Sequence, residues 1–173
     1  MRTIGIHTRV ASLIGAVALL ILISPTLAAG QGLDHNSRPV DVTFTKWGAP
    51  PPAVPPTPFF GLFEGFSGDG LLGSFNAEIL WRQQSVNGHA AGLTAMYEVV
   101  DGDRSFTALI QGGSTTAGGL LDGFIVAGWR TGARVQVALE RYGAIAGVSS
   151  CDGAPVNKTC FVGTIRVERA PRD

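Results

Sequence analysis

The stretch Leu93-Thr-Ala-Met-Tyr-Glu-Val-Val-Asp-Gly-Asp-Arg-Ser-Phe-Thr-Ala-Leu-Ile110 contains two alternating runs separated by a turn. Alternation with a period of two is typical of β-strands, whose successive side chains point to opposite faces of a sheet. The Asp101-Gly102 pair between the runs is a strong hairpin signal. The stretch therefore predicts two antiparallel strands that are neighbours in one sheet.

Similar runs continue on both sides of this hairpin, and most end in short turns rich in glycine. Together they predict about eight strands, with the others at 40–45, 59–66, 71–82, 120–129, 133–140 and 160–168. Eight antiparallel strands can close into a barrel, and closure removes exposed sheet edges. We therefore predict an all-β protein with a single antiparallel eight-stranded barrel. An open β-sandwich is the alternative.

The first part of the chain predicts export. Arg2, His7 and Arg9 precede the apolar run 10–23, and Pro25 and small residues follow it. This order is typical of a secretory signal peptide, and the apolar run is too short to span a bilayer. We expect cleavage after Ala28 or Ala29, which leaves no membrane span in the mature chain.

Three segments follow from this reading. Residues 1–29 are the predicted signal peptide, residues 30–58 hold a first strand and a proline-rich segment, and residues 59–173 form the barrel body. The run 49–58 contains most of the prolines, which favour an extended polyproline conformation. We interpret that run as a stiff spacer, with a ligand for a proline-reading domain as the alternative.

Two cysteines, Cys151 and Cys160, are present in the chain. In an exported protein an even pair is most simply a disulfide, whereas a redox pair has Cys-x-x-Cys spacing. We predict a disulfide between them and a secreted or periplasmic location.

Charge and motifs exclude several classes of function. Loss of Arg2 and Arg9 with the signal leaves 11 basic and 13 acidic residues, so neither nucleic acid nor an anionic membrane is expected as a partner. The glycines of 68–73 match a dinucleotide fingerprint but precede a strand rather than a helix, so we interpret them as a turn. No cofactor is predicted.

Catalytic and metal-binding patterns are also weak. His35 and His89 lie in predicted loops, and Asp101 and Asp103 are interpreted as turn formers rather than a carboxylate pair or calcium ligands. No spacing of His, Cys and carboxylates indicates a metal site. The catalytic residues therefore stay unassigned.

The barrel interior is the remaining candidate site. Aromatic residues on the predicted inward faces would line a cavity if one exists: Phe75, Trp81, Tyr97 and Phe106. By the same alternation Glu78, Arg82 and Glu98 would face solvent. A packed core is favoured over a cavity for a domain of this size.

Loose glycine and aromatic motifs carry a resemblance over residues 59–168. They are Phe66-Ser-Gly-Asp-Gly70, Met96-Tyr-Glu-Val99, Ser105-Phe-Thr-Ala108, Gly128-Trp-Arg-Thr-Gly-Ala133 and Cys160-Phe-Val-Gly-Thr-Ile-Arg-Val167. In these the body resembles exported bacterial members of the allene oxide cyclase barrel-like group. The resemblance implies a barrel akin to calycins and dirigent proteins; the plant cyclases of that group fold an unstable epoxide without a cofactor. It assigns no active-site residue to a position in this chain.

Three functions stay open at this point. The first is a non-enzymatic exported barrel that is structural or binds a small apolar molecule. The second is a cofactor-free isomerase or cyclase acting on a lipid-like substrate in the cavity. The third is a protein-interaction module using the outer face or the proline-rich segment.

Overall fold

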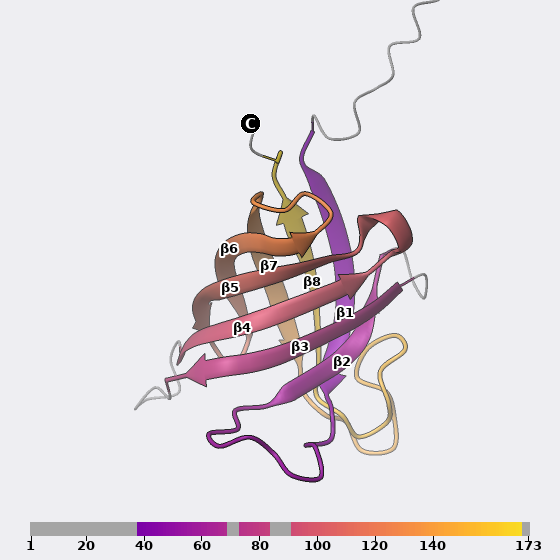
Figure 1. The fold of residues 1–173 in the computed structure, drawn as a ribbon. Coiled ribbons are helices and arrows are strands. Elements are labelled where there is room, and N and C mark those ends of the chain that lie inside the picture. The colour runs from indigo at the N-terminus through magenta and orange to yellow at the C-terminus, as the bar shows by residue number, and fades with distance from the viewer. Residues whose placement is uncertain (1–37, 69–72, 84–90, 171–173) are drawn as a thin grey trace, which may run out of the picture. The chain divides into compact units, whose positions relative to one another are not determined.

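Eight antiparallel strands form a closed barrel in the computed structural model, which describes residues 38–68, 73–83 and 91–170 (Figure 1). Each strand pairs with its neighbours in sequence, and β1 closes the barrel by pairing with β8. The strands are β1 (Val40–Gly48), β2 (Leu62–Ser67), β3 (Gly73–Arg82), β4 (Ala91–Val100), β5 (Phe106–Ser114), β6 (Gly118–Gly128), β7 (Arg134–Tyr142) and β8 (Cys160–Val167). The predicted all-β, eight-stranded antiparallel barrel is confirmed, and it is closed rather than an open sandwich.

The predicted hairpin at 93–110 is also confirmed. Strands β4 and β5 pair from Ala91 opposite Ser114 to Val99 opposite Phe106, and one 3₁₀ turn, η1 (Gly102–Arg104), joins them. Within this turn the Arg104 guanidinium pairs with the Asp101 carboxylate. Asp101 and Asp103 therefore lie in a turn, as interpreted from the sequence.

Every second side chain of most strands points into the barrel and builds one core. Its fully buried large members are Tyr97, Phe75, Ile110, Leu121, Ile125, Ile165, Val99, Val135, Val137 and Val167. Burial of this much apolar surface is the main favourable contribution to folding. The buried Val99, Val135 and Val167 lie toward the end of the barrel where β1 begins at Val40 and β8 ends, called here the entry end.

An arginine turn packs over the entry end. Arg130 is buried, and its Nη1 donates hydrogen bonds to the carbonyl oxygens of Val167 at 3.3 Å and Glu168 at 3.1 Å. Its guanidinium lies 4.4 Å from the ring centre of Trp129, which packs against Phe106. The turn between β6 and β7 thus joins the end of β8 to the core.

The opposite end, where β1, β3, β5 and β7 finish, is called here the distal end. The 143–159 connection leaves it and packs on the outside of the barrel (Figure 1). Cys151 and Cys160 are joined by a disulfide with Cα atoms 6.4 Å apart, which confirms the predicted pairing. Cys160 and Ala154 bury the outward face of Trp47, whose indole Nε1 donates to a Glu64 carboxylate oxygen at 2.9 Å.

One glycine of this connection is required by its surroundings. Gly153 has a φ of +74°, and a Cβ at this position would lie 2.0 Å from the ring of Phe66. A side chain there would be strained by the backbone and would also displace the ring. The close approach lets the connection cover Phe66 and Trp47.

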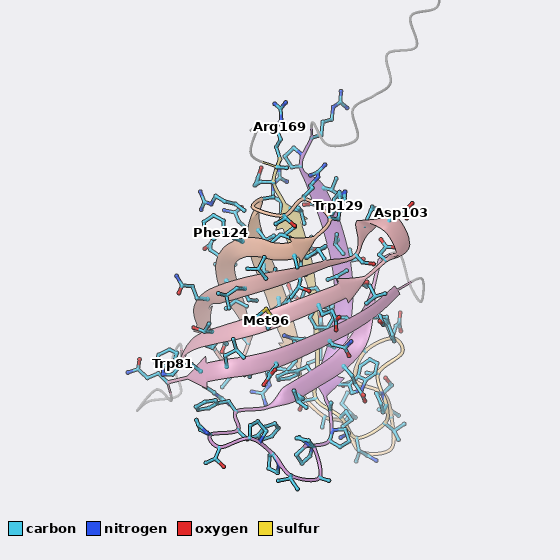
Figure 2. The ribbon with its side chains drawn as sticks, in the orientation of Figure 1. Trp81, Met96, Asp103, Phe124, Trp129 and Arg169 are labelled. Carbon is cyan, nitrogen blue, oxygen red and sulfur yellow. A yellow bond between two sulfur atoms is a disulfide. The ribbon has the colours of Figure 1, made fainter. Side chains whose placement is uncertain are left out.

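The inward position predicted for Trp81 is wrong, and a β-bulge is the reason. The register between β3 and β4 shifts between Ile79 and Trp81, so that Leu80 is the extra residue. An extra residue inverts the alternation beyond it. Trp81 is therefore 48% exposed and lies at the end of β3 in Figure 2. Arg82 pairs with the inward-facing Leu93, yet its side chain is exposed, as predicted.

Candidate ligand-binding site

A lysine points into the barrel from β1. Val42, Phe44 and Lys46 follow one another on the inward face of this strand, and Lys46 is only 5% exposed. The same alternation that buries the two apolar residues thus carries an amine into the core. Long cationic side chains are almost never buried in this way without a partner.

Lys46 is held by a tyrosine from the other side of the barrel. Its Nζ donates a short hydrogen bond to the hydroxyl oxygen of Tyr97 on β4. Tyr97 is itself 2% exposed and packs edge-on against Phe75, with ring centres 4.9 Å apart. Because its oxygen accepts from Lys46, the hydroxyl proton of Tyr97 stays able to donate to a ligand.

Aromatic rings surround the amine. The Nζ atom lies 4.3 Å from the ring centre of Tyr97 and 4.8 Å from that of Phe63. Three further rings lie between 5.6 and 5.7 Å: Phe44, Phe75 and Phe161. Ring faces attract a cation, so they offset part of the cost of burying one.

This environment changes the acidity of both partners. Burial lowers the pKa of Lys46 to about 7, because the charged ammonium loses its hydration. Burial also raises the pKa of Tyr97, which therefore stays protonated at physiological pH. The ion pairs formed among the described residues do not include Lys46. Near neutral pH the lysine is thus present both as an ammonium and as an amine.

A cavity of about 190 Å³ lies beside the pair at the distal end. Its walls are mainly apolar: Phe63, Ile79, Leu93, Ala95, Leu121, Leu139 and Phe161. Its polar lining comes from Lys46, Tyr97, Arg82, Arg141, Ser114 and Thr115. Across the lining residues that the structure describes there are three basic groups and no carboxylate.

The register explains how the basic groups converge. Lys46 on β1 lies opposite Phe161 on β8, which in turn lies opposite Arg141 on β7. The three side chains thus form one inward-facing row across adjacent strands. Arg82 lines the same cavity from β3, beyond the bulge at Leu80, and the side chains of both arginines are exposed.

A larger groove, of about 910 Å³, runs over β6, β7 and β8 but has different chemistry. Its lining consists mostly of small residues, including Gly118, Ala138 and Gly163. Its polar side chains, such as Glu140 and Thr164, are exposed or half-buried. The smaller cavity is the better candidate, because it joins apolar walls to buried polar groups.

The predicted lining residues lie in different places. Tyr97 lines the cavity, whereas Phe75 is packed beneath it and stacks on Phe44 with ring centres 4.9 Å apart. Phe106 lies near the entry end against Trp129. Trp81 points outward. His35, His89 and most of the 68–73 glycine motif lie outside the described residues.

The sequence reasoning missed Lys46, although a signal was present. The predicted strand at 40–45 ends one residue before it, and one more step of the alternation places Lys46 with Val42 and Phe44. The chain also has only two lysines, Lys46 and Lys158, against eleven arginines. Arg82 could not be found in this way, since the bulge leaves no mark in the alternation.

Neither a metal site among the described residues nor a comparison with known proteins indicates a function. In the described ranges, no group of three or more His, Cys, Asp or Glu side chains is placed to hold a metal ion, and no helix is long and apolar enough to cross a membrane. No protein-family model, curated protein or solved structure matches the chain. The residues that line the cavity are therefore the basis for a functional proposal.

Proposed function

We propose that this protein is an exported barrel that binds a small molecule with an apolar body and an anionic oxygen head group. The observation that carries the proposal is the buried pair of Lys46 and Tyr97 at an apolar cavity. Lys46 and Tyr97 both can donate to an oxygen atom, and the aromatic walls suit an apolar body. Binding a ligand without a reaction requires no functional groups beyond those that already line the cavity.

The charge of the lining favours an anion. Arg82 and Arg141 line the same cavity as Lys46, and none of the described lining residues is acidic. An anion would also favour the protonated form of Lys46, which burial otherwise disfavours. The ligand would thus supply the negative charge that the buried ammonium lacks.

The volume restricts the size of the ligand. Engineered apolar cavities of roughly 150 Å³ bind benzene. A cavity of about 190 Å³ therefore suits one ring or a short branched chain with a carboxylate. Long acyl chains would extend beyond the distal end.

Export is the second part of the proposal. The disulfide between Cys151 and Cys160 is compatible with an oxidising compartment. The signal-like residues 1–29 and the resemblance to the allene oxide cyclase barrel-like group support a secreted or periplasmic location. Intact mass of the exported protein tests this: the first residue should lie between Ala28 and Gly32, and a retained Met1 would contradict export.

A cofactor-free isomerase or cyclase is the second candidate. The specific observation in its favour is that Tyr97, a proton donor, lines the cavity beside an amine that can accept a proton. Such groups can meet charge that develops during rearrangement of a reactive substrate. If the protein rearranges a small epoxide and the Tyr97→Phe variant does not, this candidate is favoured over simple binding.

Calorimetric titration with three ligands of matched size tests the binding proposal. Benzoate, benzyl alcohol and benzylamine share a ring and differ in charge. Because a hydrogen bond to a charged group contributes roughly 1.5–3 kcal/mol, benzoate should bind at least about tenfold more tightly than benzyl alcohol. Benzylamine should bind most weakly.

Matched lysine variants locate the site. Lys46→Met should weaken the preference for benzoate and leave only the part that Arg82 and Arg141 contribute, whereas Lys158→Met, which alters an exposed lysine of the 143–159 connection, should keep it in full. Equal affinity for benzoate and benzylamine, or a preference for benzoate that Lys46→Met leaves unchanged, would overturn the proposal.

A further inference from the structure

The buried basic residue beside the cavity, Lys46, is of a kind that can become a nucleophile. An arginine stays protonated in proteins, whereas a lysine in an apolar site can lose its proton. The chain uses arginine for eleven of its thirteen basic residues, yet the position beside the cavity is a lysine. A site that needed only a permanent positive charge could have used either residue.

We propose that the amine of Lys46 captures small aldehydes and ketones in the distal cavity as an imine, with Tyr97 handling the protons. The inference rests on the proposed function, since it needs a cavity that admits a small ligand with an oxygen head group. It extends that function by naming the ligand class as carbonyl compounds and by adding a covalent step.

The geometry supplies each participant. The Nζ atom is hydrogen-bonded to the Tyr97 hydroxyl, and both groups line the cavity with Phe63 and Phe161. A carbonyl carbon within reach of Nζ would have its oxygen near the Tyr97 hydroxyl. The reacting atoms and the proton donor are thus held together before the ligand arrives, which lowers the entropic cost of the reaction.

The step balances without any further reactant. The lone pair of the neutral Lys46 nitrogen attacks the carbonyl carbon, and a C–N bond forms while the C=O π electrons move to oxygen. Tyr97 donates its proton to that oxygen and regains one from the nitrogen. Tyr97 then protonates the hydroxyl, the C–O bond breaks to release water as the nitrogen lone pair forms the C=N bond, and the remaining N–H proton returns to Tyr97. One amine and one carbonyl compound become one imine and one water.

The aromatic walls of the cavity favour the imine over its hydrolysis. Imines hydrolyse in water, and the five rings around Nζ limit the access of water to the new bond. The titratable and charged groups that line the cavity with Lys46 are Tyr97 of β4, Arg82 of β3 and Arg141 of β7. The two arginines would hold a carboxylate on the same ligand, so oxo acids should react best.

Reductive trapping tests the proposal on the full exported chain. The protein is incubated with benzaldehyde and cyanoborohydride at pH 7, and benzylated lysines are located by peptide mass mapping. Lys46 should be modified at least about tenfold faster than the exposed Lys158, because Lys46 lies beside the cavity and burial lowers its pKa to about 7, so much of it is present as the reactive amine at this pH. 4-Formylbenzoate should react faster than benzaldehyde.

Two variants identify the participants. Lys46→Arg should abolish modification at position 46 and leave the rate at Lys158 unchanged. Tyr97→Phe should slow modification of Lys46 by roughly 100-fold if the hydroxyl acts as a general acid, and by little if it only positions the amine. Circular dichroism and the unfolding midpoint confirm that each variant is folded.

The results separate this inference from the proposed function. Benzoate binding at Lys46 with no faster trapping there than at Lys158 would overturn the imine alone. Trapping at Lys46 without a preference for benzoate over benzylamine would support the imine and overturn the anion-binding function. Absence of both would overturn both.

Discussion

Lys46 on β1 and Tyr97 on β4 lie 51 residues apart in the chain and share a buried hydrogen bond inside the barrel. The bond brings together two groups that are separately costly to bury. Because both groups line a cavity, each can donate a hydrogen bond to an oxygen atom of a ligand.

The stability of the fold should rise with pH above neutrality because of Lys46. Its pKa is about 7 in the folded protein, against an ordinary value of 10.5, so between these values the unfolded chain binds more protons. This linkage contributes up to about 1.4 kcal/mol per pH unit. From pH 7.5 to 9.5 the free energy of unfolding should increase by roughly 2 kcal/mol after allowance for the aromatic rings.

Urea denaturation across this range measures the effect. Lys46→Met should flatten the pH dependence, and Lys158→Met should leave it as in the unmodified protein. A slope that is the same in both variants would show that another group causes it.

Truncation of Phe75 should destabilise the protein much more than truncation of Trp81, the other aromatic residue of β3. Phe75→Ala removes a fully buried ring that stacks on Phe44, so it should destabilise the protein by roughly 3–5 kcal/mol. Trp81→Ala removes a half-exposed ring beyond the bulge and should cost about 1 kcal/mol or less. Chemical denaturation of both variants decides this, and equal losses would contradict the bulge at Leu80.

The disulfide should stabilise the connection that covers Trp47. It closes a loop with a sequence separation of nine residues, which in the chain-entropy model contributes roughly 2.5–3 kcal/mol. Cys151→Ala should lower the unfolding midpoint, and reducing agent should lower that of the unmodified protein but not of the variant. If the reducing agent lowers the unfolding midpoint of both proteins equally, loss of the disulfide is not the cause.

Arg82 should select the charge of the ligand without affecting the fold. Arg82→Gln removes one of the two arginines at the cavity, so benzoate should bind roughly 3- to 10-fold more weakly while benzyl alcohol binds as before. Arg104→Gln, in the η1 turn, is the matched control. Titration calorimetry at low and high salt measures both, and loss of benzyl alcohol binding would point to a folding defect instead.

The fold was predictable because alternation and glycine turns are local signals. The hairpin 93–110 shows this best, since its two runs and the Asp101-Gly102 turn specify their own pairing. Closure of β1 on β8 followed from the number of strands, because eight can close without leaving an edge. The pairing of Cys151 with Cys160 followed from their number, their spacing and the predicted export.

The site was only partly predictable. Tyr97 was expected inside, and its parity holds because no bulge precedes it in β4. Lys46 was missed because a charged side chain at the end of a strand pattern is usually solvated. Trp81 was wrongly placed inside, and the position of Arg82 at the cavity was missed, because a bulge depends on contacts between strands, which a single alternating run does not record.

The most direct test is lysine NMR, since the chain has just two lysines to observe. With ¹³C-labelled lysine, the side-chain signals of Lys46 and Lys158 are assigned with the two Met variants and followed as benzoate is added and as pH is changed. The account predicts that Lys46 titrates near pH 7 without ligand, and that benzoate shifts its signal and raises its pKa while Lys158 is unaffected. A Lys46 signal that titrates near 10.5 and does not respond to benzoate would contradict it.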